Sequence, residues 1–387
     1  MRIAIFSNAY LPSISGVVNS ITLFRKGLIA AGHEVHVFAP EYEEYEDEEP
    51  YIFRFPALDL SDQLDISIIV PIKYRLGPTV EGIKPALIHS QHPAWMGDLA
   101  VSFARSLNIP LVFTFHTQYE KYVQQYTPIA SKLAGLITDE VIKRYLRNCE
   151  HVVVPTESVR EMLAENYGIE QGVSVVPTPV DLVKFQDIHP EKVRTSFGLE
   201  GKEVLLFVGR LAREKGLDML LQAFTLIHEQ RPEVRLLLLG RGPYEGALKT
   251  QLAKLGFKDL VIFAGPVPHE EVPGYYAAAD LFVFPSTTET QGLVIIEAMA
   301  AGIPVVAVRA PGAVDVLTEG GGVLTENKPA IFAREVVDIL ADSGRQKELR
   351  DEALRAVERY SISDATARML NAYETALESW ENRDRER

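Results

Sequence analysis

Two glutamates spaced eight residues apart are the side chains of this sequence best suited to chemistry. Glu289 and Glu297 lie in the segment T-T-E-T-Q-G-L-V-I-I-E-A-M-A-A-G-I-P, directly after an apolar run. If a helix starts near Gln291, Glu289 precedes it and Glu297 lies on its second turn, since eight residues span about 12 Å of helix axis. A diphosphate at the helix start then brings sugar hydroxyls to Glu289 and ribose hydroxyls to Glu297. The spacing equally allows Glu289 to cap the helix and Glu297 to face solvent.

A second candidate is a loop with two cations. The segment G-R-L-A-R-E-K-G at 209–216 directly follows another apolar run. A glycine loop at the end of a strand suits a diphosphate, because Arg210 supplies a planar fork of donors and Lys215 a point charge. We interpret Arg213 and Glu214 as ordinary surface residues.

Two further glycine loops give weaker signals. Gly16, in S-I-S-G-V-V-N-S, follows the first apolar run and allows close approach of the backbone to a phosphate at a helix start. The segment G-R-G-P-Y-E-G at 240–246 is one residue off the dinucleotide-binding spacing. Pro243 at the first position of a helix explains much of that segment structurally.

One histidine stands at the end of a predicted strand. His116, in F-T-F-H-T-Q-Y-E-K-Y, is placed to face a ligand and to exchange hydrogen bonds near neutral pH. His89 and His92 follow another strand and compete for this role, and a lone histidine is more often structural. No serine or cysteine lies in a nucleophile elbow.

The elements that must position these residues alternate between short apolar runs and helical patterns. Strands that are apolar throughout predict parallel sheets covered on both faces, and so an α/β fold. The predicted strands form two series, at 3–6, 34–38, 86–90, 111–114 and 151–154, and then at 203–208, 235–239, 260–263, 281–284 and 304–308. Helices are predicted at 217–229, 270–278 and 362–387.

The two series predict two domains with Rossmann-like sheets. The prolines of V-P-T-P-V-D at 176–181 cannot lie inside a helix or a central strand, so the hinge is placed there. The predicted divisions are 1–177, 178–361 and a C-terminal helix at 362–387. Both sheets are expected to face one cleft at their carboxyl edges, where such sheets bind nucleotide-type ligands. The acidic run at 41–49 is interpreted as a solvated loop without function.

Composition excludes several classes of protein. The chain has 387 residues with 39 Lys and Arg against 53 Asp and Glu, a net charge of −14 that disfavours nucleic acid as a partner. We find no apolar run long enough to cross a membrane and no signal peptide. The single cysteine, Cys149, fits a cytoplasmic location, and no Cys and His cluster has the spacing of a zinc site.

Together these segments resemble the retaining, nucleotide-sugar-dependent glycosyltransferases of the GT-B fold, a large family of bacterial hexosyltransferases. The resemblance covers nearly the whole chain, and its most specific element is the E-x7-E motif formed by Glu289 and Glu297. It implies two Rossmann-like domains facing a cleft. It also implies transfer of a hexose from a nucleoside diphosphate sugar with retention at the anomeric carbon.

The resemblance implies a role for each candidate residue. Arg210 and Lys215 would hold the donor diphosphate, and Gly16 would line the phosphates. Glu297 would bind the ribose and Glu289 the hydroxyls of the transferred sugar. The remaining implied roles are His116 beside the reacting sugar, Gly292 and Leu293 against the nucleotide sugar, and Tyr119 and Tyr122 on the acceptor side. Two departures from the family are Ser15 where many relatives have glycine, and T-P-V-D at 178–181 where many have N-G-V-D.

Within the family, H-T-Q-Y-E-K-Y at 116–122 and E-T-Q-G-L at 289–293 look most like diacylglycerol glucosyltransferases. That similarity implies UDP-glucose as donor, a membrane lipid such as diacylglycerol or a glycolipid as acceptor, and peripheral attachment to the inner face of the membrane. A basic and aromatic stretch after His116 suits anionic lipid, although a solvated helix face is the alternative; it comprises Tyr119, Lys121, Tyr122, Tyr126, Lys132, Lys143, Arg144 and Arg147.

No cofactor and no obligatory metal are expected, because Arg210 and Lys215 supply cations and the chain has no D-x-D triplet. Two alternatives remain open: transfer to a soluble saccharide, and a non-hydrolysing sugar-nucleotide epimerase, which would share the two-domain fold. A binding protein without catalysis is a third. A nicotinamide-dependent dehydrogenase is disfavoured by the missing fingerprint.

Overall fold

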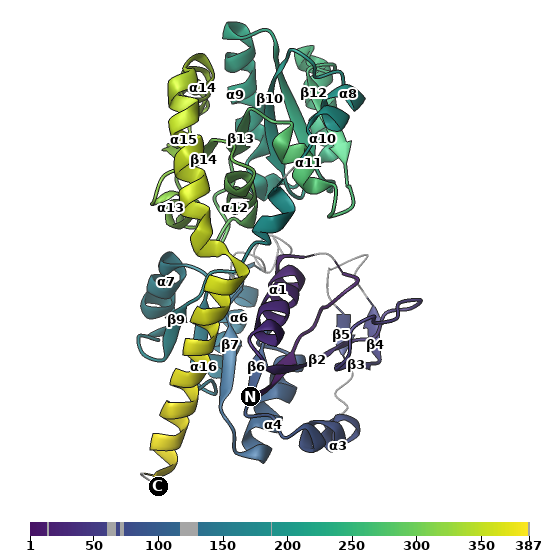
Figure 1. Ribbon diagram of the computed structural model, residues 1–387, viewed down its shortest axis with the longest axis vertical. Helices are drawn as coiled ribbons and strands as arrows, with labels where there is room; N and C mark the ends of the chain where they lie inside the picture. The colour runs from purple at the N-terminus through teal and green to yellow at the C-terminus, as the bar shows by residue number, and fades with distance from the viewer. Residues whose placement is uncertain (14, 60–66, 70–72, 117–130, 187, 386–387) are drawn as a thin grey trace. The chain divides into compact units, whose positions relative to one another are not determined.

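The chain folds into two compact units. The computed structural model describes residues 1–387 apart from 14, 60–66, 70–72, 117–130, 187 and 386–387. The first unit comprises Met1–Pro179 and Ile362–Arg387, and the second comprises Val180–Ser361 (Figure 1). The division therefore falls between 179 and 180, inside the proline segment, compared with the expected 177 and 178. The C-terminal helix belongs to the first unit.

The first unit is built on a parallel sheet with the strand order β3-β2-β1-β6-β7-β8-β9. The strands are β1 (Arg2–Phe6), β2 (Glu34–Pro40), β3 (Ile52–Phe55), β6 (Leu87–Ser90), β7 (Leu111–Thr114), β8 (His151–Val154) and β9 (Val173–Val175). A separate antiparallel pair consists of β4 (Ala57–Asp59) and β5 (Ser67–Ile69). The sequence does not predict the edge strands β3 and β9, because they are short, mostly half-buried and lack a continuous apolar run.

The helices of the first unit are α1 (Gly16–Ala30), α3 (Lys73–Ile83), α4 (Met96–Leu107), α6 (Ser131–Leu146), α7 (Glu157–Tyr167) and α16 (Ile362–Arg385). Helix α16 packs against α1, with Met369 and Tyr373 fully buried in one cluster with residues of β1 and α1 (Figure 1). The two helices approach so closely that a Cβ at Gly27 would lie 2.0 Å from Thr366 Oγ1. Among the described residues, no helix combines the length and apolar character needed to span a membrane.

The second unit has a parallel sheet with the order β12-β11-β10-β13-β14-β15. The strands are β10 (Glu203–Val208), β11 (Val234–Leu239), β12 (Val261–Gly265), β13 (Leu281–Phe284), β14 (Val305–Val308) and β15 (Gly322–Thr325). The helices are η1 (Leu182–Phe185), α8 (Glu191–Ser196), η2 (Arg213–Lys215), α9 (Leu217–Gln230), α10 (Glu245–Leu255), α11 (Val272–Ala277), α12 (Leu293–Ala300), α13 (Pro311–Leu317), α14 (Pro329–Ala341), α15 (Ser343–Ala356) and η3 (Val357–Tyr360).

Apolar side chains cover both faces of this second sheet. Leu205 and Phe207 of β10 join one buried cluster, while Val204 and Leu206 join the cluster on the opposite face. Successive side chains of a strand point to opposite faces, so a strand buried on both faces must be apolar at every position. This explains why the central strands of both units are predictable from apolar runs alone.

Both sheets reverse their strand order at one point. In the first unit the reversal lies between β1 and β6, and in the second it lies between β10 and β13. Loops leave the carboxyl ends of two adjacent strands in opposite directions at such a point, which opens a crevice where α/β sheets bind ligands. The candidate residues follow the strands that flank or adjoin these points.

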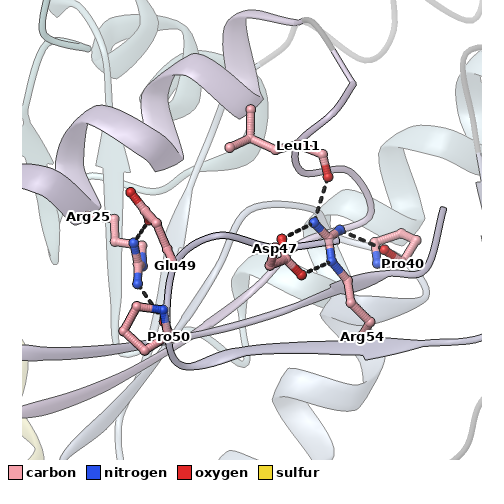
Figure 2. A network of polar contacts seen from close by, with 7 residues as sticks. All are labelled: Leu11, Arg25, Pro40, Asp47, Glu49, Pro50 and Arg54. Atoms are coloured by element: carbon pink, nitrogen blue, oxygen red, sulfur yellow. Dashed lines mark hydrogen bonds and ion pairs between the residues drawn. The ribbon is translucent and has the colours of Figure 1, made fainter. Parts of the chain in front are cut away.

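The acidic segment between β2 and β3 is anchored by two arginines (Figure 2). Arg54 of β3 donates to both carboxylate oxygens of Asp47 at 2.6 and 2.8 Å, and to the carbonyls of Pro40 and Leu11. Arg25 of α1 is 3% exposed and contacts Glu49. The expected solvent exposure is confirmed for the acidic side chains other than Asp47. The segment is also anchored, and Arg54 connects it to the loop that precedes α1.

Candidate functional site

Lys215 and Glu289 meet in the second unit. Lys215 ends η2 in the loop after β10, and Glu289 lies in the loop after β13. The Lys215 ammonium forms an ion pair with Glu289 Oε1, to which Ser286 Oγ also donates a hydrogen bond of 3.3 Å. Because β10 and β13 are adjacent parallel strands, their following loops start side by side. The structure thus joins two residues that the sequence separates by 74 positions.

The loops of this site are packed backbone against backbone. Gly216 follows Lys215 at φ +73°, and a Cβ there would lie 2.4 Å from the Pro285 carbonyl oxygen. A Cβ at Gly312, in α13, would lie 2.8 Å from the Glu289 carbonyl oxygen. Only residues without a side chain permit these approaches. The two glycines thereby fix the positions of Lys215 and Glu289.

Glu297 lies on α12 and is held by a tyrosine. Its carboxylate accepts a hydrogen bond of 2.8 Å from the hydroxyl of Tyr276, and burial raises its pKa to about 7. The solvent-facing alternative for Glu297 is therefore wrong. Glu289 does not cap α12, because the capping position is Gly292 at φ +72° and has no side-chain cap. The helix begins at Leu293, two positions after the expected Gln291.

Arg210 is exposed on the loop after β10. The loop after β11 packs against it. Leu211 donates its N–H to the carbonyl of Arg241 and accepts from the N–H of Tyr244. A Cβ at Gly242 would lie 2.3 Å from the Leu211 carbonyl oxygen. The 240–246 segment thus shapes the cation loop, but the expected helix start at Pro243 is wrong: α10 begins at Glu245, and Tyr244 is its capping residue. Arg213 stacks 4.9 Å from the centre of the Tyr244 ring, which suits its assignment to the surface.

Two polar side-chain contacts in the first unit join β6 with β7 and the residues that directly follow them. His89 Nε2 lies 2.7 Å from Thr114 Oγ1, and His116 Nε2 lies 2.7 Å from Gln91 Oε1. The other ring nitrogen of His89 lies 2.7 Å from the Tyr373 hydroxyl on α16. His89 is therefore a satisfied core histidine. An amide oxygen only accepts, so His116 donates from Nε2.

His116 and its neighbours are held uncharged. Burial lowers the pKa of His116 to about 3, helped by His92 and His89, and lowers those of His92 and His89 to about 4 and about 3. His92 Nδ1 accepts a hydrogen bond of 3.1 Å from the N–H of Asn8, so it connects the loops after β6 and β1. At neutral pH His116 is a hydrogen-bonding group and carries no charge.

The start of α1 explains one departure from the family pattern. Ser15 caps the helix, since its hydroxyl accepts from the N–H of Val18 at 3.2 Å, and the exposed Gly16 is the first helical residue. The serine thus satisfies a helix N–H group that glycine would leave open. Tyr119 and Tyr122 lie outside the described residues.

Each unit thus presents polar groups at the carboxyl edge of its sheet, at the switch point or one strand away from it. The second offers cations, carboxylates and the start of α12, and the first offers an uncharged histidine and the start of α1. Among the described residues, no group of three or more His, Cys, Asp or Glu side chains could hold a metal ion. The second unit has the groups that a sugar linked to a diphosphate requires: cations for phosphate oxygens and carboxylates for hydroxyls.

Comparison with known proteins identifies the family. The Glycosyltransferase Family 4 model matches residues 14–184, and the model for Glycosyl transferases group 1 matches residues 190–356. Alpha-monoglucosyldiacylglycerol synthase of Streptococcus pneumoniae is 33% identical over 316 residues, which cover 79% of this chain and 71% of that protein. The chain belongs to the group 1 glycosyltransferases. It is therefore a nucleotide-sugar-dependent transferase.

A second relative and a solved structure support the same family and fold. Alpha-monoglucosyldiacylglycerol synthase of Acholeplasma laidlawii is 31% identical over 339 residues, which cover 83% of each chain. Among solved structures, Anabaena HepE in complex with UDP superposes with a TM-score of 0.75 at 20% identity, covering 97% of this chain and all of that one. The likeness confirms the expected GT-B fold of two parallel-sheet domains.

Proposed function

We propose that this glycosyltransferase moves glucose from UDP-glucose to a membrane lipid, diacylglycerol or a glycolipid, with retention at the anomeric carbon. The meeting of Lys215 and Glu289, with Glu297 on the following helix, carries the proposal. In this assignment Lys215 and Arg210 bind the diphosphate, Glu289 the glucose hydroxyls and Glu297 the ribose. The start of α12 at Gly292 and Leu293 adds backbone N–H groups for phosphate oxygens.

Two relatives that synthesise alpha-monoglucosyldiacylglycerol support glucose as the sugar and a lipid as the acceptor. UDP as the nucleotide is supported by HepE, whose structure holds UDP. The exposed cations Arg144 and Arg147, at and just after the end of α6, suit an anionic lipid surface. Each cation near such a surface adds about 1 kcal/mol of attraction. Tyr119 and Tyr122 are assigned to the acceptor side.

Retention is proposed to occur by substitution on one face of the sugar. The bond from the anomeric carbon to the diphosphate oxygen breaks, the acceptor oxygen bonds to that carbon from the same side, and the leaving phosphate takes the acceptor proton. Lys215 and Arg210 stabilise the negative charge that grows on the diphosphate, and so no obligatory metal ion is required. Glu289 is engaged by Lys215 and is not assigned as a nucleophile.

Two residues of the first unit are assigned the roles that the family resemblance implies. His116 is assigned to a hydrogen bond with the transferred sugar, because it stays uncharged and Gln91 fixes its orientation. Gly16 at the start of α1 is assigned to the phosphates, where the helix offers unpaired N–H groups.

A panel of donors and acceptors tests the proposal. UDP-, GDP- and ADP-sugars are incubated with the protein, with and without diacylglycerol in detergent, and both the released nucleotide and the anomeric configuration of the product are measured. We expect release of UDP only when both UDP-glucose and the lipid are present, and a product with an α linkage. A better soluble acceptor would contradict the lipid assignment, whereas conversion of the sugar nucleotide without acceptor would indicate the epimerase.

Binding to membranes is tested separately by sedimentation with vesicles that contain anionic lipid, at low and at high salt. We expect sedimentation with the vesicles at low salt and release at high salt, because attraction between exposed charges is screened. Protein that stays in the supernatant under both conditions would contradict the membrane assignment.

A further inference from the structure

Tyr276 is a buried residue whose hydroxyl contacts Glu297 of the candidate site. It lies on α11 with 0% exposure, and its hydroxyl is 2.8 Å from Glu297 Oε2 and 3.2 Å from the Val294 carbonyl oxygen. Its ring packs against Phe282 of β13 and Phe185 of η1, with centroids 5.6 and 6.0 Å away. Ring packing and these two hydrogen-bond contacts hold the hydroxyl beside the carboxylate.

This contact holds one oxygen of the carboxylate. A tyrosine hydroxyl has one proton to donate, and a bond to an ionised carboxylate is stronger than one to a carbonyl. No described residue donates a hydrogen bond to the other carboxylate oxygen, Oε1. The hydroxyl therefore restrains the Glu297 carboxylate through Oε2 and does not occupy Oε1.

We propose that Tyr276 is a positioning residue that keeps Glu297 an oriented, ionised acceptor for the two ribose hydroxyls, and so gives the donor site its preference for ribonucleotides. The inference rests on the proposed function, in which Glu297 binds ribose. Tyr276 touches no substrate in this account; it acts through the carboxylate.

The charge state of Glu297 provides a readout. Burial raises its pKa to about 7, while the hydroxyl of Tyr276 on α11 and the charge of Lys184 on η1 lower it. Ribose hydroxyls donate to the ionised form, so the affinity for a ribonucleotide should rise as pH increases through this pKa. Removal of the tyrosine hydroxyl takes away one group that favours ionisation, so the midpoint should move to higher pH.

The test compares UDP with its 2′,3′-dideoxy analogue by calorimetry between pH 5.5 and 9. The variants are Tyr276→Phe, Glu297→Gln and, as a matched control, Tyr275→Phe. Tyr275 is the neighbouring buried tyrosine of α11, 7% exposed. Melting temperatures confirm that each variant is folded.

We expect the wild type and Tyr275→Phe to bind UDP at least about tenfold more tightly than the analogue at pH 7.5, as for the loss of a hydrogen bond to a charged group. Tyr276→Phe should lose most of this preference at neutral pH, regain part of it at pH 9, and bind the analogue as the wild type does.

Two results overturn the inference. Tyr276 has no positioning role if Tyr276→Phe weakens the binding of UDP and of the analogue equally. The same holds if Tyr276→Phe prefers UDP as strongly as the wild type does while Glu297→Gln loses that preference. In both cases the ribose assignment of Glu297 survives. If the wild type binds both nucleotides alike, the ribose assignment itself is wrong, and the inference is overturned with it.

Discussion

Replacing Glu289 with glutamine removes the carboxylate that Lys215 contacts. A nucleoside diphosphate without sugar must draw the ammonium of Lys215 toward its phosphates, in competition with Glu289. The paired side chains are 22% and 27% exposed, so solvent screens them, and such pairs contribute about 0.2–1 kcal/mol. Glu289→Gln is therefore expected to bind free UDP about 1.4- to 5-fold more tightly.

The same substitution should act in the opposite direction on turnover. In the proposed function Glu289 binds hydroxyls of the transferred sugar, so turnover of UDP-glucose should fall at least about tenfold, as for the loss of one charged hydrogen bond. Lys215→Met should weaken the binding of UDP about 10-fold or more and also reduce turnover. UDP should therefore bind more tightly to Glu289→Gln and more weakly to Lys215→Met, and these opposite effects distinguish the roles of the two side chains.

Calorimetry with UDP and a steady-state release assay measure these effects. Glu233→Gln is the matched control, because Glu233 pairs with Lys202 in the same unit and is given no role in the site. If Glu289→Gln weakened the binding of UDP as much as Lys215→Met, the carboxylate would be a support of the diphosphate site, and the competition argument would be refuted.

Three further predictions concern the first unit. His116→Ala should reduce turnover about 10- to 100-fold, while UDP affinity and the melting temperature stay nearly unchanged; a much lower melting temperature with full turnover would show a structural role. Burial lowers the pKa values of His89, His92 and His116 to about 3, 4 and 3. The free energy of unfolding should therefore be greatest above pH 6.5 and fall toward pH 4, because the unfolded chain takes up protons that the folded chain excludes. Urea unfolding at pH 7.5 and 5.0 checks this sign, and equal midpoints would contradict it. Arg54→Met should lower the free energy of unfolding by about 2–3 kcal/mol and make the acidic segment susceptible to a glutamyl endopeptidase. The control Arg368→Met, which removes an ion pair on a helix surface, should lower it by less than about 0.5 kcal/mol. Similar losses in both variants would refute the anchoring role.

The sequence predicts the central strands well because burial on both faces demands apolar residues. It also predicts that Arg210 and Lys215 follow β10 and that Glu289 lies before α12, since these positions depend only on where a strand ends or a helix begins. The edge strand β15 escapes prediction because three of its four residues are only half-buried, so its composition is less constrained.

Contacts between distant segments are what the sequence does not reveal. Tyr276 is predicted to lie on a helix, yet no local pattern indicates that its hydroxyl reaches Glu297, because α11 and α12 are separated by β13. The anchoring of the acidic run is similarly hidden. Charge repulsion within the run suggests solvent exposure, and the compensating Arg25 lies on α1, before the segment in the chain.

The return of α16 to the first unit has a consequence for biosynthesis. A ribosome completes Val180–Ser361 before it has made Met369 and Tyr373, which belong to the core of the first unit. The inserted unit can therefore reach its native state first, since domains fold as units during synthesis. Meanwhile the nascent first unit has an open apolar face where α16 later packs on α1. That interval, set by chain order alone, is when this face is most exposed to chaperones and to aggregation.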